Sequence, residues 1–409
     1  MRENPRTQLW WCNLLHIFND GYLTSLALLL PFIAADFDLD YAEAGLIKST
    51  TSIAISAAQI PAGLAAERFG EILILGLGTA WFSLSYAAML VVAGYPLVLL
   101  LAFSGGVGGG AFHPVGTALI ANVFPEERSG AAIGTLNSCG DVGKVVFPAV
   151  VGMLVVVIGW RWTFAVEGAA GAVLALLYLF FFRREIVERL QQLRRQRQGA
   201  VDQSDRRDRS LRGRLAGWGI CAPRQFTLYT TIGFVDVAAR TAVTAFLGFA
   251  LFEAGIEDGE TLGWLMSLHF FGGAIGKLLC GMVVGRWGSR SVILATEVLT
   301  VLGCLAMPSV PSGWPLLLFL PAFGFVLNGT SSAIYIGLAP TFTREQRSRG
   351  YALYYSINFF SVALAPVLFG LVADAFELRA VFLSAGLVMA MGLPLVFFMR
   401  DERAQTRTG

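Results

Sequence analysis

Ionisable side chains interrupt otherwise apolar stretches of this chain, and their spacing is the first indication of chemistry. Three pairs have helical spacing: His16 and Asp20, Asp236 and Arg240, and Asp141 and Lys144. Residues three or four apart lie on one face of a helix, so the members of each pair can interact. A carboxylate whose cationic or imidazole partner moves away can take up a proton near neutral pH.

Each pair has two interpretations. The first is a structural staple whose members neutralise each other, because removing one member of a buried ion pair costs about 3–5 kcal/mol. The second is an exchange of partners, in which a proton or an anionic solute replaces one member. On the second interpretation we predict proton coupling by Asp20, His16, Asp236 and Asp141. Asp20 is favoured because no basic residue follows it within a helical turn.

A second set of polar side chains is predicted to contact a solute. Basic side chains within the apolar stretches favour an anionic or zwitterionic solute, and the set comprises His113, Lys144, Arg240, His269, Lys277 and Asn328. His113 precedes Pro114, whose missing amide hydrogen bends a helix at that point. The imidazole can serve as a solute contact or proton relay, or simply bond to a backbone carbonyl.

The elements that position these groups are apolar stretches of membrane length. Hydrophobic residues make up 56% of the 409 positions and charged residues 14%. Twelve stretches of about 20 residues or more, from Leu9–Ile33 to Ala380–Met399, are long enough to cross a bilayer as helices. The sequence therefore predicts an all-α integral membrane protein with twelve transmembrane helices.

The stretches fall into two copies of a six-helix unit. Gly63-Leu-Ala-Ala-Glu67-Arg68-Phe-Gly70 returns 218 positions later as Gly281-Met-Val-Val-Gly285-Arg286-Trp-Gly288. Phe18-Asn-Asp20 returns as Phe234-Val-Asp236. We predict two pseudo-symmetric six-helix bundles, residues 1–182 and 225–409, the second with a short cytoplasmic tail, joined by a basic cytoplasmic linker over residues 183–224.

The repeated glycine motif predicts a gate. Its residues are Gly63, Glu67, Arg68, Gly70 and the second-copy Arg286. The glycines permit a tight turn, and Glu67 can meet a basic group or the positive end of a neighbouring helix when the cytoplasmic side is closed. The alternative is a turn that only fixes topology. Gly285 replaces the acid in the second copy, so the two copies are not equivalent.

Loop charges predict the orientation. Twenty-four basic residues lie on one side of the predicted spans and two, Arg161 and Arg379, on the other. The positive-inside rule therefore places both termini in the cytoplasm, in a multi-pass protein of the inner membrane. The first span carries His16 and Asp20 and is too long for a cleaved signal peptide. The linker is expected to lie against anionic headgroups, with a regulatory site as the alternative.

The paired glycine motifs, the six-plus-six repeat and the central basic loop resemble the major facilitator superfamily over the whole chain. His16-x-Phe-Asn19-Asp20-x-Tyr22 and Phe112-His113-Pro114 are similar to the fosmidomycin-resistance-type branch of bacterial efflux proteins. This chain departs from that branch with Val115-Gly116 after the proline, and Phe147 precedes Pro148 where drug exporters carry Gly-Pro. The resemblance implies two bundles that alternate access to a central site, and export of a toxic or antibiotic-like compound.

The sequence thus predicts a proton-coupled carrier. Uptake of an organic anion or metal chelate is the competing function, and an enzyme or a membrane sensor is a remote one, since no catalytic motif is found. The expected partners are a small solute and the lipid bilayer, with no nucleic acid, and the chain is expected to be a monomer. No cofactor is expected beyond the proton gradient. The spacing of the five cysteines indicates neither a disulfide nor a metal site.

Overall fold

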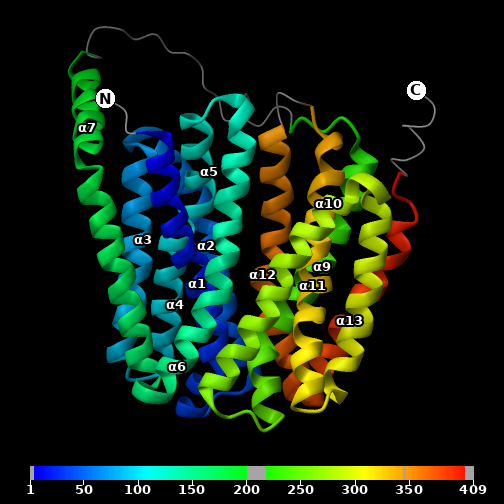
Figure 1. The fold of residues 1–409 in the computed structure, drawn as a ribbon. Helices are drawn as coiled ribbons and strands as arrows, with labels where there is room; N and C mark the ends of the chain where they lie inside the picture. The colour runs from blue at the N-terminus through cyan, green and yellow to red at the C-terminus, as the bar shows by residue number, and fades with distance from the viewer. Residues whose placement is uncertain (1–3, 200–217, 344–346, 401–409) are drawn as a thin grey trace. The chain divides into compact units, whose positions relative to one another are not determined.

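The fold is a set of long helices connected by short loops (Figure 1). The structure is a computed structural model that describes residues 4–199, 218–343 and 347–400. Part of the predicted linker, residues 200–217, and most of the predicted tail, residues 401–409, lie outside the described residues. An isolated bridge between Ile220 and Phe342 supplements the helices.

The helices of the first half of the chain cover nearly every described residue from Pro5 onward. They are α1 (Pro5–Phe37), α2 (Tyr41–Phe69), α3 (Glu71–Ala87), α4 (Tyr95–Gly109), α5 (Phe112–Val123), α6 (Glu126–Phe181) and α7 (Arg183–Gly199). Those of the second half are α9 (Pro223–Glu253), α10 (Gly259–Ala306), α11 (Trp314–Leu338), α12 (Arg347–Phe376) and α13 (Arg379–Val396). Short 3-10 turns follow α3, α10 and α11.

The described residues contain the twelve predicted spans. Nine helical segments among them are long and apolar enough to cross a membrane. Two of the nine, α6 and α10, each contain two helices that meet at a glycine with positive φ, Gly159 (φ 74°) and Gly288 (φ 75°). These two divisions and the more polar α2 bring the total to twelve, which confirms the predicted fold class.

Both copies of the glycine motif end in the same backbone conformation. Gly70, between α2 and α3, has φ 98°, and its counterpart Gly288 has φ 75°. L-residues with a side chain rarely adopt such angles, whereas glycine does so without steric cost. The tight turn predicted from sequence is therefore present in both repeats.

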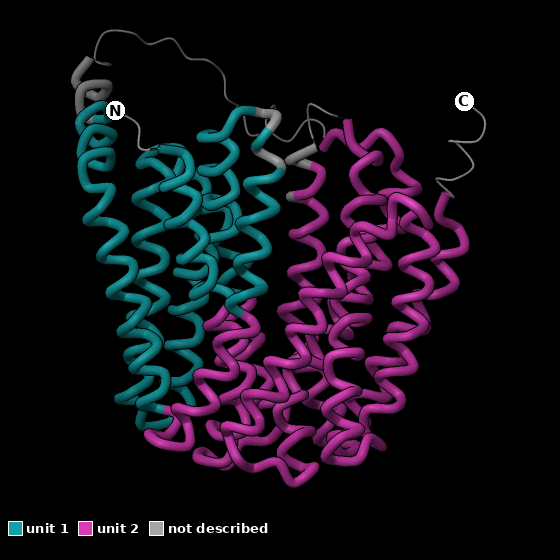
Figure 2. Tube along the Cα trace, viewed as in Figure 1, with its two compact units in different colours: residues 1–20, 53–143, 161–217 teal, residues 21–52, 144–160, 218–409 magenta. Residues whose placement is uncertain are grey.

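The chain packs into two compact units, shown in Figure 2. Unit 1 contains residues 1–20, 53–143 and 161–217, and unit 2 contains residues 21–52, 144–160 and 218–409. The helices α1, α2 and α6 contribute to both units, since unit boundaries fall inside them. The two bundles predicted from sequence, residues 1–182 and 225–409, were defined by the sequence repeat, whereas these units are defined by packing. The predicted division therefore stays a prediction.

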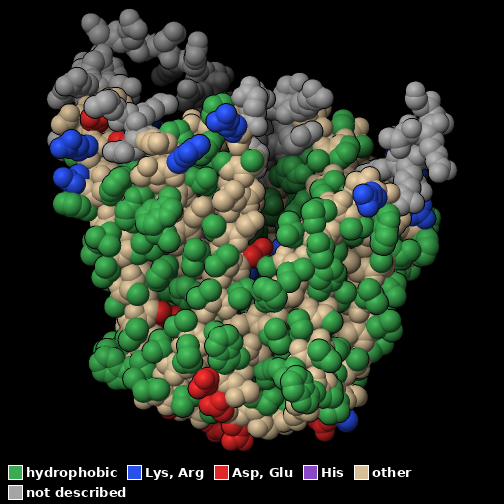
Figure 3. All heavy atoms as spheres, in the orientation of Figure 1, with side chains coloured by type: hydrophobic (Ala, Val, Ile, Leu, Met, Phe, Trp, Pro, Cys, Tyr) green, Lys and Arg blue, Asp and Glu red, His purple; other side chains and the backbone are tan. Residues whose placement is uncertain are grey.

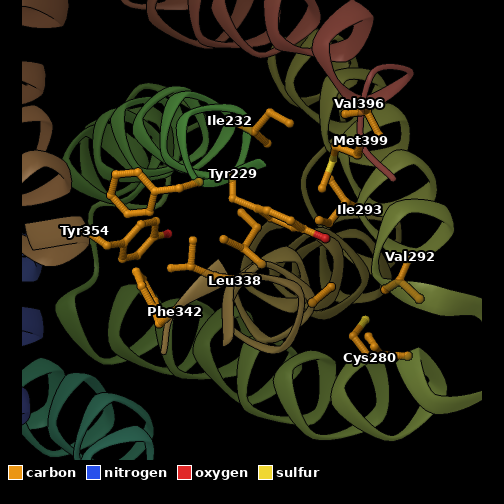
Figure 4. Packing of buried hydrophobic residues seen from close by; sticks show 14 residues of the cluster. Tyr229, Ile232, Cys280, Val292, Ile293, Leu338, Phe342, Tyr354, Val396 and Met399 are labelled. Carbon is orange, nitrogen blue, oxygen red and sulfur yellow. The ribbon is translucent and has the colours of Figure 1, made fainter. Parts of the chain in front are cut away.

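Each unit has an apolar core. In unit 1 it includes Cys12 of α1, Phe112 of α5, and Leu136 and Tyr178 from the two segments of α6. In unit 2 it lies where α9 to α13 meet and includes Tyr229, Ile293, Leu338, Tyr354 and Val396 (Figure 4).

The outer surface is also apolar. Hydrophobic side chains dominate the visible face in Figure 3. Exposed examples include Leu176 and Phe180 on α6 and Leu278 and Met282 on α10. A large continuous apolar surface of this kind is the expected surface of a helix bundle in lipid.

Small residues allow α10 and α11 to approach closely. A Cβ atom added at Gly272 would meet the carbonyl of Pro321, one at Gly276 the carbonyl of Phe325, and one at Gly324 the carbonyl of His269. This is the small-residue packing that membrane helices use, in which dispersion contacts replace the hydrophobic effect.

Asp258 caps the start of α10. Its carboxylate accepts hydrogen bonds from Thr261 N (2.9 Å) and Thr261 Oγ1 (2.7 Å). These bonds lower the pKa of the Asp258 carboxyl.

We predict that Gly276→Ala destabilises the protein by about 1–3 kcal/mol, because the methyl group must displace the backbone of α11. The matched control is Gly285→Ala on the same helix, where an added Cβ meets nothing within 4 Å. The control is expected to be neutral or to stabilise by about 0.5–1 kcal/mol through helix propensity. Thermal unfolding of the detergent-solubilised variants measures both, and equal melting temperatures would contradict the proposed packing.

Candidate functional site

Three predicted residues converge in unit 1. His16 and Asp20 lie on α1, and His113 lies in the first turn of α5. His16 Nε2 is 3.4 Å from Asp20 Oδ1, and His113 Nε2 is 3.8 Å from the same oxygen. The first two residues are buried, with 2% and 4% exposed, whereas the side chain of His113 is 40% exposed. The cluster thus combines a buried carboxylate with one imidazole that is partly exposed to solvent.

The break between α4 and α5 positions His113. Pro114 lacks the amide hydrogen that would bond to the carbonyl of Gly110, one turn earlier. The chain accordingly leaves α4 after Gly109 and starts α5 at Phe112. The predicted bend is therefore present one turn before the proline.

Contacts on several sides orient the ring of His16. Its Nδ1 lies 2.7 Å from the carbonyl oxygen of Leu136, which can only accept, so Nδ1 carries the hydrogen. Phe112 stacks on the ring at a centroid distance of 4.5 Å. Nε2, which has no hydrogen-bond partner and is buried, then faces the carboxylate of Asp20. A neutral Nε2 and an ionised carboxylate present lone pairs to each other, so a cation or proton between them is stabilised.

Glycines on α6 make room for this arrangement. A Cβ atom at Gly140 would lie 2.7 Å from both His16 Nε2 and Asp20 Oδ2. One at Gly143 would meet the carbonyl of Ile17. These two glycines therefore admit α1 against α6. Asp141 and Lys144, which follow on α6, are both half-buried.

Unit 2 holds the second predicted pair. Arg240 Nη2 lies 3.5 Å from Asp236 Oδ2 on α9, and Asp236 is 1% exposed. Glu297 of α10 is buried and close enough to interact electrostatically with both members. In contrast to Asp20, Asp236 lies beside a permanent cation. The two repeats therefore hold their acids in different electrostatic settings.

The remaining predicted solute contacts lie on α10 and α11. His269 is fully buried between the rings of Phe270 and Phe323, at centroid distances of 5.5 and 5.8 Å. Asn328 is buried against Gly273 and donates from Nδ2 to the carbonyl of Gly324 (3.1 Å). Lys277 is half-buried. These three residues belong to unit 2, and their role in solute binding stays a prediction.

The predicted gate has a partner that sequence reasoning missed. Arg189 Nη2 of α7 donates to the backbone carbonyl of Glu67 (3.1 Å), and its Cγ lies against Gly70. The exposed Arg68 lies over the ring of Phe69, 5.2 Å from its centroid. A Cβ atom added at Gly63 would meet nothing within 4 Å, and Arg286 in the second copy is exposed. The start of the linker thus packs on the motif turn as a helix.

A second contact that the sequence did not reveal joins α2 to α12 within unit 2. The amides of Tyr41 and Ala42, at the start of α2, donate to the two carboxylate oxygens of Asp374 at 2.8 and 3.0 Å. The hydroxyl of Tyr41 donates to Glu253 Oε1 (2.6 Å). Below this cap, Gly45 packs against the carbonyl of Pro366. A carboxylate at the positive end of a helix dipole makes the contact favourable.

Comparison with known proteins identifies the family. The model of the Major Facilitator Superfamily matches residues 9–257 and 229–409. The chain belongs to the major facilitator superfamily. It is accordingly a multi-pass membrane protein and a secondary transporter of small-molecule solutes, not an enzyme.

Individual members of the superfamily are similar over most of the chain. A probable L-galactonate transporter of Escherichia coli is 26% identical over 92% of this chain and 85% of its own. Multidrug resistance protein MdtG of Dickeya zeae is 26% identical over 84% of this chain and 81% of its own. A bacterial homologue of the lysosomal transporter Spinster, crystallised inward-facing and unoccupied, superposes with a TM-score of 0.75 over 97% of both chains at 15% identity. That similarity supports the superfamily fold.

We predict that Arg240→Gln destabilises the protein by about 3–5 kcal/mol, because it leaves the buried carboxylate of Asp236 without its ion pair. The exposed pair of Arg379 and Glu377, 3.0 Å apart, supplies the control, and Arg379→Gln is expected to cost less than about 1 kcal/mol. Thermal unfolding of both variants tests the difference.

The double variant Asp236→Asn with Arg240→Gln separates the two interpretations of the pair. Both predict stability above that of Arg240→Gln, since position 236 no longer carries a buried charge without its ion pair. A structural staple predicts recovered transport as well, whereas partner exchange predicts a folded but inactive protein. Solute exchange by the double variant in proteoliposomes therefore decides between them.

Proposed function

We propose that this transporter moves a small organic anion across the inner membrane in exchange for protons, with both termini in the cytoplasm. The observation that carries the proton coupling is the geometry around Asp20. His16 Nε2 faces its carboxylate at 3.4 Å, while Nδ1 is committed to the carbonyl of Leu136. A proton is favoured between these two groups, and the half-exposed His113 provides its route to water.

The anionic character of the solute has two kinds of support. Four basic side chains, Lys48, Lys144, Arg240 and Lys277, lie within spans, where an unpaired charge costs about 2.5–3.5 kcal/mol. Such cations persist when they pair with an acid or with a negatively charged solute. The similar Escherichia coli protein carries the name of a sugar-acid anion, L-galactonate. We therefore assign Lys144, Arg240 and Lys277, with His113, His269 and Asn328, to the solute.

Transport is proposed to follow alternating access, with a gate at each membrane surface. The motif turn of Glu67, Arg68 and Gly70, held by Arg189, serves as the cytoplasmic gate, with Gly63 and Arg286 as its further members. The contact of Tyr41 and Ala42 with Asp374 serves as the outer gate. Both are charge-assisted contacts at helix ends, which water can replace when a gate opens.

Export is the proposed direction. It rests on the resemblance of the His16 and His113 motifs to the fosmidomycin-resistance-type branch and on the similarity to a multidrug resistance protein. Uptake of an organic anion is the second candidate, favoured by the similarity to the probable L-galactonate transporter. Vesicles of opposite orientation distinguish the two. An exporter fills inverted vesicles with an acidic lumen, whereas a proton symporter fills right-side-out vesicles in an acidic medium.

We predict that Asp20→Asn abolishes accumulation driven by a pH gradient but retains exchange of labelled for unlabelled solute, because a neutral amide cannot release a proton. Proteoliposomes with L-galactonate as the first probe of a panel of organic anions provide the measurement. Glu260→Gln, which neutralises an exposed acid at the start of α10, is the control and is expected to behave like the wild type. Normal gradient-driven accumulation by Asp20→Asn would reject the assignment.

A further inference from the structure

The cluster of His16, Asp20 and His113 has the composition of a transition-metal site. Each residue offers one ligand atom, and the three atoms lie within 4.8 Å of one another. Imidazole nitrogens favour zinc, cobalt, nickel and copper, whereas magnesium and calcium prefer sites made only of oxygen. Two imidazoles and one carboxylate are also a ligand set of zinc enzymes that keep a fourth position open.

The spacing of the ligand atoms suits a metal ion. Zinc binds imidazole nitrogen and carboxylate oxygen at about 2.0–2.1 Å, so two ligands of a tetrahedral site lie about 3.3 Å apart. The observed separations from Asp20 Oδ1 are 3.4 Å to His16 Nε2 and 3.8 Å to His113 Nε2. A shift of a few tenths of an ångström by the half-exposed His113 brings the second distance into range.

The surroundings already prepare the ligands. The bond of His16 Nδ1 to the Leu136 carbonyl leaves Nε2 as the atom with a free lone pair, and such an outer contact fixes the imidazoles of metal sites. Asn19 Nδ2 donates to Asp20 Oδ1 (3.2 Å) and orients the carboxylate. His16 Nε2 is buried and has no hydrogen-bond partner, although it lies 3.4 Å from Asp20 Oδ1. This polar atom is the independent sign that the cluster is built to receive a cation.

We propose that His16, Asp20 and His113 bind one divalent transition-metal ion of the zinc type, with the fourth position open to water or to the carboxylate of a solute. The two positive charges of the ion exceed the single negative charge of Asp20, so the occupied site attracts an anion. The ion and the proton occupy the same space, so metal binding inhibits proton-coupled transport. Metal binding itself does not depend on the proposed function.

Direct binding measurements test the site. Calorimetric titration of the purified chain, without a histidine tag, is expected to give one Zn²⁺ per chain, with Mg²⁺ not competing. The visible spectrum of bound Co²⁺ is expected to report a four-coordinate ion. Affinity is expected to fall as the pH is lowered, because protons compete for the imidazoles and the carboxylate.

Variants locate the site. His113→Gln and Asp20→Asn are each expected to weaken Zn²⁺ binding at least tenfold. Removing an outer-shell partner of a metal ligand already costs about that much, and these variants remove a ligand itself. Cys221→Ser removes an exposed thiol that could bind zinc adventitiously, and it is the control expected to bind as the wild type does. A wild-type chain that binds neither ion, or a His113→Gln variant with unchanged affinity, would overturn the proposal.

Gly140→Ala provides a sharper test, because it retains all three ligands and places a methyl group 2.7 Å from two of them. We expect it to abolish binding of Zn²⁺. Undiminished Zn²⁺ binding by this variant would overturn the proposal. Should the variant fail to fold, His113→Gln decides, since that side chain is 40% exposed and tolerates replacement. Metal binding by a chain that shows no proton coupling would reject the proposed function and leave this site intact.

Discussion

The close approach of α1 to α6 is the constraint on which the polar chemistry of unit 1 depends. Gly143 brings the backbone of α6 against Ile17, and Gly140 leaves the space that His16 and Asp20 fill. The same approach places the Leu136 carbonyl within 2.7 Å of the His16 ring. Polar groups within a membrane span are costly. His16 and Asp20 are tolerated because α6 supplies the Leu136 carbonyl as an acceptor and has no side chain at Gly140.

The buried acids of the two repeats have different partners. Asp236 has a guanidinium beside it on its own helix, and a guanidinium stays charged over the physiological pH range. Asp20 has two imidazoles, whose charge depends on protonation. A duplicated scaffold thus holds one acid beside a guanidinium and the other beside two imidazoles. Under the proposed function, the acid beside the imidazoles is the one that takes up and releases the proton.

Local features of this fold were predictable from sequence, and long-range features were not. The twelve spans follow from the length of the apolar stretches, and the positive φ of Gly70 and Gly288 from the repeated motif. The shared face of His16 and Asp20 follows from helical spacing. The convergence of His113 on Asp20 does not, because 93 positions separate them and only the packing of α1, α5 and α6 brings them together. The contact of Arg189 with Glu67 and that of Asp374 with α2 are hidden for the same reason.

The carboxylate of Asp374 on α12 caps the start of α2 and so joins the ends of these two helices. Its carboxylate accepts two backbone amides whose orientation is set by α2, so the bond directions depend on the helix end and not on flexible side chains. These two bonds therefore constrain the angle at which α12 meets α2, while the hydroxyl bond from Tyr41 to Glu253 is what depends on side-chain identity. In the proposed outer gate, water replaces these two bonds on opening, and their fixed directions return the helices to one register on closing.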